Sequence, residues 1–328
     1  MPDGVPDHAF AKLTAVSIPE SKPPMERPAG LPVVAVVGAT ASGKSALALD
    51  VAERLGGEIV NTDSMQVYRG MDVGTAKLPP AERRGIAHHL LDVLDVTEPA
   101  TVAQFQAWAR EVVDDCHRRG VTPVLVGGSA LYTRAILDEF EFPGTDPDIR
   151  GRLEDELAQV GAEALHARLA GVDPAAAAQM LPQNGRRVVR ALEVIEMTGR
   201  PWTPSLPEPR YHYGTAVQIG VDIDRATLDR RIAQRVEQMW EGGFVEEVRR
   251  LAEHGLREGR TAYRALGYQQ IMSFLDGEIT LDQAKEQTVN RTRRFARRQD
   301  GWFRKDPRIT WVPYDHPARV ERALAAIS

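Results

Sequence analysis

The stretch Leu31–Ser45 reads LPVVAVVGATASGKS and is the strongest indication of the fold in this sequence. Its first half, residues 32–37, is a continuous apolar run rich in valine, which is typical of a strand buried on both faces of a parallel sheet. A glycine-containing turn follows, and we predict a helix over residues 44–55. The turn matches the pattern G-x-x-x-x-G-K-[ST] in the strand–turn–helix context of a phosphate-binding loop (P-loop), formed by Gly38, Ala39, Thr40, Ala41, Ser42, Gly43, Lys44 and Ser45.

Each part of this loop has a chemical role. Backbone N–H groups and the positive end of the following helix bind phosphate oxygens. Lys44 brings a mobile charge to the terminal phosphates, and the Ser45 hydroxyl is the predicted Mg²⁺ ligand. The pattern does not say whether the ligand is a nucleotide such as ATP or another diphosphate.

Strands and helices alternate along most of the chain. Apolar runs at residues 58–61, 122–126 and 216–223 predict strands, and residues 101–119 have helical spacing. This order predicts an α/β fold, a P-loop NTPase-like parallel sheet with right-handed crossovers. From residue 226 we expect a helical tail, broken near Gly242–Gly243 and Gly267.

A helical segment interrupts the alternation. Asp146 can cap a helix that has Pro147 at its first position, and Asp173 can cap another in the same way. The chain reads as helical from there to about residue 199, and a proline-rich loop follows at 200–210. We therefore predict an all-helical insertion domain at 138–207, a core domain at 31–137 and 208–328, and a proline-rich disordered leader at 1–30.

Composition bounds the function. The 328 residues carry a formal net charge of −5, so a site for a polyanion has to be a local patch. The single cysteine, Cys116, excludes an internal disulfide and is interpreted as a structural thiol in a reducing cytoplasm. No apolar run is long enough for a bilayer, so we expect no membrane association.

One acidic residue follows a predicted strand close to the P-loop. Asp63 lies at the edge where open α/β sheets bind ligands. Two interpretations stay open from the residues alone: a general base or Mg²⁺ ligand, or a helix cap together with Ser64.

These motifs together resemble the tRNA dimethylallyltransferase family in its bacterial form. The resemblance covers about residues 31–313, and residues 63–77 (DSMQVYRGMDVGTAK) are its most distinctive part. Further matching stretches are residues 88–93, 126–132, 184–193, 265–270 and 292–304. Ala39, Ser129 and Ala130 depart from the usual proline, threonine and glycine, and none of these changes removes a group that the chemistry needs.

The resemblance implies a reaction and its site. A dimethylallyl group passes from dimethylallyl diphosphate to the exocyclic amine of adenosine 37 in tRNAs that read codons beginning with U, with Mg²⁺ as the cofactor. Asp63 becomes the candidate base, since the amine needs a proton acceptor. Thr40 and Ser129 are expected as hydroxyl donors, and either Arg231 or Arg235 as a contact to the diphosphate.

The resemblance also implies contacts to the tRNA anticodon stem-loop. Basic residues with interleaved aromatic side chains occupy residues 291–308, which suits phosphate contact and base stacking. A second basic patch lies in the predicted insertion, whereas the adjacent His88 and His89 are interpreted as packing residues. The expected tRNA contacts are Asp63, Ser64, Met65, Gln66, Arg150, Arg186, Arg187, Arg190, Arg294, Arg297 and Arg298.

Three alternatives compete with this interpretation. A small-molecule kinase would also use the P-loop but leaves the basic cluster at 291–308 without a role. A non-catalytic nucleic-acid-binding module would be indifferent to Asp63. An adenylate isopentenyltransferase would share the chemistry on a free nucleotide, which does not require the helical insertion. For the tRNA-modifying interpretation we expect a monomer.

Overall fold

The computed structural model describes residues 31–139, 142–202 and 208–327. The predicted leader at 1–30 and the middle of the predicted loop at 200–210 lie outside the described residues. Among the described helices, none combines the length and the apolar composition that crossing a bilayer requires.

A six-stranded sheet, parallel throughout, forms the centre of the fold, in the order β3-β2-β4-β1-β5-β6. The central strand pairs on both sides, since Val36 lies opposite Val126 and Ile219. The α/β fold with a P-loop-type parallel sheet is confirmed. The strands are β1 (Val33–Val37), β2 (Glu58–Asn61), β3 (His88–His89), β4 (Pro123–Gly127), β5 (Ala216–Asp222) and β6 (Ile309–Pro313).

Alternate residues of β1 enter two different hydrophobic cores. Val34 and Val36 pack with α1 (Lys44–Leu55) and α11 (Arg319–Ala325) on one face of the sheet. Val33, Ala35 and Val37 pack on the other face, in the core that includes α2 (Val102–Arg118) and α3 (Ala130–Leu137). Burial on both faces explains why β1 is continuously apolar.

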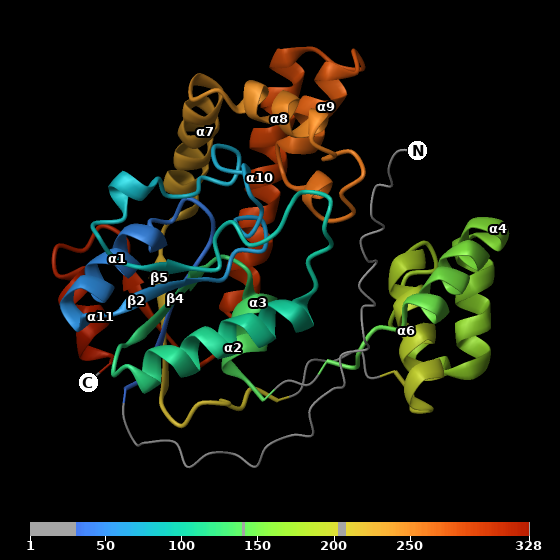
Figure 1. The fold of residues 1–328 in the computed structure, drawn as a ribbon, viewed down its shortest axis with the longest axis horizontal. Coiled ribbons are helices and arrows are strands. Elements are labelled where there is room, and N and C mark those ends of the chain that lie inside the picture. Colours follow the sequence, from blue (N-terminus) through green and yellow to red (C-terminus); the bar gives the residue numbers. More distant parts are fainter. Residues whose placement is uncertain (1–30, 140–141, 203–207, 328) are drawn as a thin grey trace, which may run out of the picture. The chain divides into compact units, whose positions relative to one another are not determined.

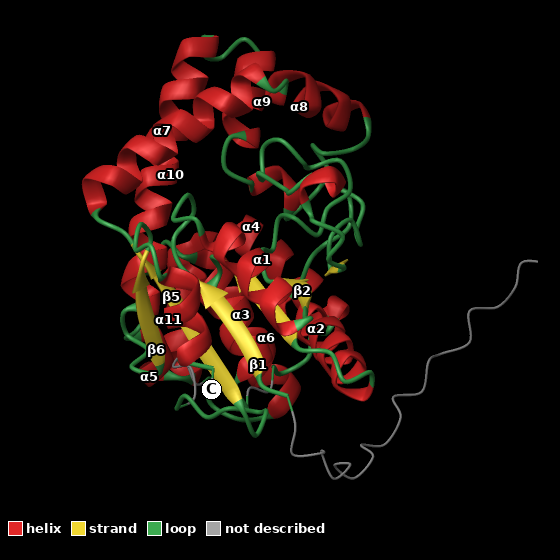
Figure 2. Cartoon of the chain, turned by 90° about the vertical axis from the view of Figure 1, so that its left-hand side faces the viewer, coloured by secondary structure: helices red, strands yellow, loops and turns green. Residues whose placement is uncertain are grey.

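Four helices lie beyond the carboxyl ends of the strands: α7 (Arg225–Glu241), α8 (Phe244–Glu253), α9 (Tyr268–Leu275) and α10 (Leu281–Phe303) (Figure 2). The predicted breaks are confirmed, because Gly243 and Gly267 precede α8 and α9 with φ of 87° each. The prediction of a purely helical tail is wrong, because β6 returns to the sheet and pairs with β5. Two 3-10 turns, η1 (Pro80–Glu82) and η2 (Ala262–Arg264), complete the core.

The helical insertion consists of α4 (Pro147–Val172), α5 (Pro174–Ala177) and α6 (Gly185–Thr198), with α4 and α6 side by side (Figure 1). The predicted caps are present: Asp146 accepts from the backbone N–H of Asp148 and Ile149, and Asp173 accepts from that of Ala176. The three helices share a hydrophobic cluster of their own.

The chain enters and leaves this insertion through adjacent segments. Glu139 N–H donates to the Arg210 carbonyl and His212 N–H donates to the Leu137 carbonyl, each at 2.7 Å. Between them Asp138 is fully buried and forms an ion pair with Arg308 at 2.6 Å. This pairing agrees with the predicted boundaries near residues 138 and 207, which stay a prediction.

Candidate active site

The P-loop is preformed between β1 and α1. Ala41 and Gly43 adopt positive φ, 65° and 100°, and turn the chain into the N-terminus of α1. The Lys44 ammonium lies back across the loop and donates to the Ala39 carbonyl at 3.3 Å. The loop surrounds its own lysine in this way. An anion can bind in the loop if the Lys44 ammonium releases the Ala39 carbonyl and donates to the anion instead.

The charge of Lys44 depends on its surroundings. Desolvation by burial and the nearby Arg235 lower the pKa of Lys44 to about 8, whereas Asp63 opposes the shift. An ammonium destabilised by burial and by a neighbouring cation gains from any anion that enters the loop. The pKa therefore supports an anion site between Lys44 and Arg235.

The two candidate arginines of α7 lie on different sides of the P-loop. Arg235 donates to the Thr40 hydroxyl at 3.2 Å and lines the main cavity beside the loop. Arg231 donates to the Ser42 carbonyl at 3.3 Å and stacks over the Tyr314 ring at 4.5 Å, in a separate cavity. Among the described residues neither arginine forms an ion pair with a carboxylate, so it is the position of Arg235 in the cavity that also contains Thr40 and Asp63 that favours it as the diphosphate contact.

Asp63 follows the carboxyl end of β2, and one of its carboxylate oxygens accepts a hydrogen bond within a local turn. Its Oδ1 accepts from the Met65 N–H at 2.9 Å, and Asn61 Oδ1 accepts from the Asp63 N–H at 2.9 Å. Among the described residues no hydrogen bond reaches Oδ2. No helix begins at Asp63, because residues 64–67 form bends and a turn, so the helix-cap interpretation is wrong. One carboxylate oxygen fixes the side chain in this turn, and the other is available to a ligand, as the base interpretation requires.

A cavity of about 260 Å³ brings the predicted groups together. Thr40, Asp63, Ser129 and Arg235 all line it, as do Ser64 and Met65. The other walls come from α7 and α10 together with the segments at 74–76 and 264–266, and their residues were not predicted as catalytic or tRNA contacts. These walls are Gly74, Thr75, Ala76, Ile232, Val236, Met239, Arg264, Ala265, Leu266, Thr288, Thr292, Phe295 and Gln299.

Helical spacing accounts for the two long walls. The α7 residues Ile232, Val236 and Met239 recur every three or four positions, as do Thr288, Thr292, Phe295 and Gln299 of α10. This periodicity was visible in the sequence. What it could not show is that both faces turn toward the P-loop.

The predicted Mg²⁺ ligand Ser45 is exposed, and it lines a smaller cavity of about 150 Å³ with Asn61 and Gln66. Hydroxyl and carboxamide oxygens are hard donors that suit Mg²⁺, which usually keeps several waters and binds through substrate phosphates. The donors present fit a cation that arrives with a diphosphate. Mg²⁺ binding itself stays a prediction.

A hydrogen-bonded carboxylate braces one wall of the main cavity. Glu247 of α8 is 3% exposed and accepts from the backbone N–H groups of Asp72, Val73 and Gly74 at 2.7–3.1 Å. It also accepts from the Tyr268 hydroxyl at 2.6 Å. Burial, together with the negative charge of Glu247, raises the pKa of Tyr268 well above its usual value. The segment that leads into Thr75 and Ala76 is therefore fixed from α8.

The predicted tRNA contacts in the insertion fall into two groups. Arg150 and Arg190 both form ion pairs with Glu193, whose side chain is fully buried. Burial opposes ionisation of Glu193, but hydrogen bonds from these two arginines lower its pKa. Arg186 and Arg187 are exposed. The latter pair is the part of this patch that a phosphate backbone could reach without breaking a buried ion pair.

The basic cluster at 291–308 divides in the same way. Arg304 and Arg308 form ion pairs with Asp222 and Asp138. Arg294, Arg297 and Arg298 are exposed on α10, on turns adjacent to the cavity wall formed by Phe295 and Gln299. Arg298 lies over the Phe295 ring at 5.8 Å, and within the described part of the chain none of the three arginines forms an ion pair, so their charges are accessible to a polyanion beside the candidate site.

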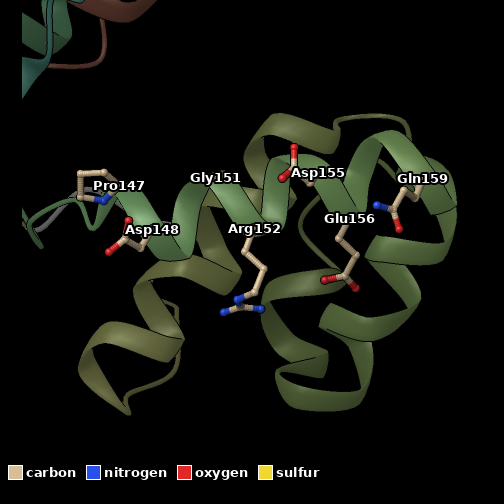
Figure 3. A pocket seen from close by; sticks show the side chains of 7 residues that line it. All are labelled: Pro147, Asp148, Gly151, Arg152, Asp155, Glu156 and Gln159. Atoms are coloured by element: carbon tan, nitrogen blue, oxygen red, sulfur yellow. The ribbon is translucent and has the colours of Figure 1, made fainter.

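A cavity of about 550 Å³ lies elsewhere, along α4 (Figure 3). All its labelled side chains come from that helix, and the charged ones are mostly carboxylates. Asp148, Asp155 and Glu156 would repel a phosphate, while Arg152 forms an ion pair with Glu196. This surface has the wrong charge for the predicted ligands, so size alone does not locate the site.

Among the described residues, Glu58, His89 and Cys116 form the group whose atoms could hold a metal ion. Arg119 already binds both carboxylate oxygens of Glu58 at 2.7 Å, and it lowers the pKa of Glu58 to about 2. Burial, then the charge of Glu58, raises the pKa of Cys116 to about 11. A neutral thiol beside a satisfied carboxylate is a structural contact, as predicted for Cys116. His88 Nδ1 lies 2.8 Å from the Ile86 carbonyl.

Comparison with known proteins agrees with the geometry. Residues 66–306 match the family model of IPP transferase. A "tRNA dimethylallyltransferase" from Nocardioides sp. is 65% identical over 297 residues, covering 90% of this chain and 96% of the relative. One of the same name from Streptomyces coelicolor is 59% identical over 308 residues, with 94% and 97% covered.

Solved structures are similar over most of the chain. The tRNA isopentenylpyrophosphate transferase of Bacillus halodurans is 39% identical with a TM-score of 0.65, covering 89% of this chain and 93% of that one. A eukaryotic dimethylallyltransferase acting on tRNA has a TM-score of 0.77 at 24% identity, covering 90% and 77%, and supports the fold. With the family model spanning most of its length, the chain belongs to the IPP transferase family.

Proposed function

We propose that this protein transfers a dimethylallyl group from dimethylallyl diphosphate to the exocyclic amine of adenosine 37 in tRNAs that read codons beginning with U, with release of diphosphate. Family membership supports prenyl transfer to tRNA. The observation that carries the proposal is the main cavity, where a P-loop, a carboxylate and an apolar wall meet.

The cavity suits both halves of the donor. The diphosphate would lie on the P-loop between Lys44 and Arg235, and the apolar prenyl chain would lie against Val236 and Met239 of α7. Ser45 would hold Mg²⁺ together with donor phosphate oxygens. Bound Mg²⁺ would neutralise charge that develops on the leaving diphosphate.

Asp63 is the proposed base for the acceptor amine. The adenine amine attacks the first carbon of the donor, the carbon–oxygen bond breaks, and diphosphate leaves with the electron pair. The amine then loses one proton, which passes to a carboxylate oxygen of Asp63. Thr40 and Ser129 line the same cavity, and their hydroxyl groups can donate hydrogen bonds to the prenyl donor or to the base.

The acceptor adenosine has to leave its stack to enter this cavity, which costs a few kcal/mol and less in a loop than in a duplex. We expect Ser64, Met65 and Gln66 to contact the nucleotides next to it, since they adjoin Asp63. We expect the exposed arginines of α10 and of the insertion to contact the tRNA backbone.

A transfer assay tests the proposal. Purified protein, Mg²⁺, labelled dimethylallyl diphosphate and unmodified tRNA are combined, and the nucleosides are identified after digestion. Label on adenosine 37 alone is the expected result. Label on free adenylate in a parallel reaction would assign the chain to adenylate prenylation. ATP consumption with phosphorylation of a small molecule, and no label on tRNA, would contradict the proposal in favour of a kinase.

A further inference from the structure

One buried side chain connects the P-loop to the neighbouring strand. Gln299 of α10 is 7% exposed and lines the main cavity. Its Oε1 accepts from the Thr40 N–H at 2.8 Å, and its Nε2 donates to the Gly128 carbonyl at 2.7 Å. A single carboxamide thus bridges the P-loop and the end of β4.

The backbone leaves room for this bridge. A Cβ atom at Gly128 would lie 2.3 Å from Gln299 Nε2, so any larger residue would displace the carboxamide. The chemistry is also selective. The bridge needs one acceptor and one donor on the same short group, and a carboxylate has no donor for a carbonyl oxygen.

The hydrogen bond from Thr40 to Gln299 restrains the position of Thr40 in the P-loop. Its N–H is bound to Gln299, and its hydroxyl accepts from Arg235. Thr40 is therefore held from both sides, by α10 through its backbone and by α7 through its side chain. A loop so fixed needs little reorganisation when an anion binds, which is the condition for strong electrostatic stabilisation.

We infer that Gln299 is a positioning residue that fixes the P-loop against the end of β4. The diphosphate site on the loop and the cavity residues Asp63 and Ser129 thereby keep fixed positions relative to each other. The inference rests on the proposed function, because prenyl transfer is the reason why these two groups of residues need fixed relative positions. The bridge itself is independent of which prenyl acceptor is used.

The test replaces Gln299 by methionine, which has similar size but neither hydrogen-bonding group. Affinity for inorganic pyrophosphate with Mg²⁺, measured by calorimetric titration, should fall about 10- to 100-fold, because two hydrogen bonds that preorganise the loop are lost. Affinity for tRNA should stay within about threefold. The kcat/KM for dimethylallyl diphosphate should fall with the pyrophosphate affinity.

Gln283→Met is the matched control, since Gln283 caps the exposed N-terminus of the same helix by bonding to Thr280 N–H. It should leave pyrophosphate affinity unchanged. Gln299→Glu keeps the acceptor for Thr40 but removes the donor and adds a negative charge, so it should bind pyrophosphate more weakly than Gln299→Met does.

The outcomes separate the inference from the proposed function. Wild-type pyrophosphate affinity in folded Gln299→Met or Gln299→Glu would overturn the positioning role. If Gln299→Met does not fold, Gln299→Glu carries the same test. A wild-type protein that binds pyrophosphate, loses this binding on Gln299→Met, and transfers no prenyl group to tRNA would refute the proposed function and leave the positioning role standing.

Discussion

Replacing Glu247 by glutamine should destabilise the protein by about 3 kcal/mol. The carboxylate accepts three backbone N–H groups and the Tyr268 hydroxyl while almost fully buried. A carboxamide has a single acceptor oxygen, so its NH₂ would face the Gly74 N–H. The tyrosine hydroxyl can reverse its role, but one buried N–H would lose its partner, and the remaining bonds would lose their charge assistance.

Urea unfolding followed by tryptophan fluorescence measures this cost. For a chain of this size, about 3 kcal/mol corresponds to a decrease in Tm of roughly 4–5 °C. Glu246→Gln is the control, because Glu246 precedes Glu247 on α8 but is exposed. Its only ion pair among the described residues is a long one, 3.9 Å to Arg249. That variant should stay within about 0.5 kcal/mol of wild type. Equal stabilities for the two variants would refute the role assigned to Glu247.

Four further predictions concern single side chains. Asp63→Ala should lower the transfer rate at least about 100-fold while tRNA affinity changes only a few-fold; near-normal turnover would remove Asp63 from the base role. Arg235→Ala should weaken pyrophosphate binding more than Arg231→Ala, as measured by calorimetry, and the reverse order would reassign the diphosphate contact. The lowered pKa of Lys44, about 8, means that its charge is lost as pH rises through 8, so the affinity advantage of wild type over Lys44→Met should shrink above that pH. Cys116, with its raised pKa of about 11, should react slowly with iodoacetamide at pH 8 in the folded protein and much faster in urea; equal rates would show an accessible thiolate.

The local parts of the fold were predictable because they depend on short-range patterns. The strand–turn–helix at residues 31–55 has a continuous apolar run, a glycine turn and a helical spacing next to each other. The strand β6 was missed because it is a short edge strand with a partly exposed pattern, next to a strongly basic helix. Its partner β5 is far away in the sequence, so no local signal identifies the pairing.

The site was predictable where a motif carried the chemistry and unpredictable where packing decides direction. Arg231 and Arg235 share one face of a helix in the sequence, yet α7 passes the P-loop so that only Arg235 enters the main cavity. A partial signal existed for Arg190, whose partner Glu193 follows three residues later. The wall residues of α10 needed the tertiary structure, since nothing local orients that helix toward residue 40.

The two ends of the helical insertion lie next to each other, so the insertion is a separable part of the chain. Because Leu137 and Glu139 bond directly to His212 and Arg210, the core would need only a short turn to close that gap without the intervening segment. Chain closure over so small a span costs little entropy. The insertion supplies none of the six strands of the sheet, and the P-loop lies between β1 and α1, outside the insertion. The helices could therefore be lengthened, exchanged or removed without rebuilding the sheet and the P-loop.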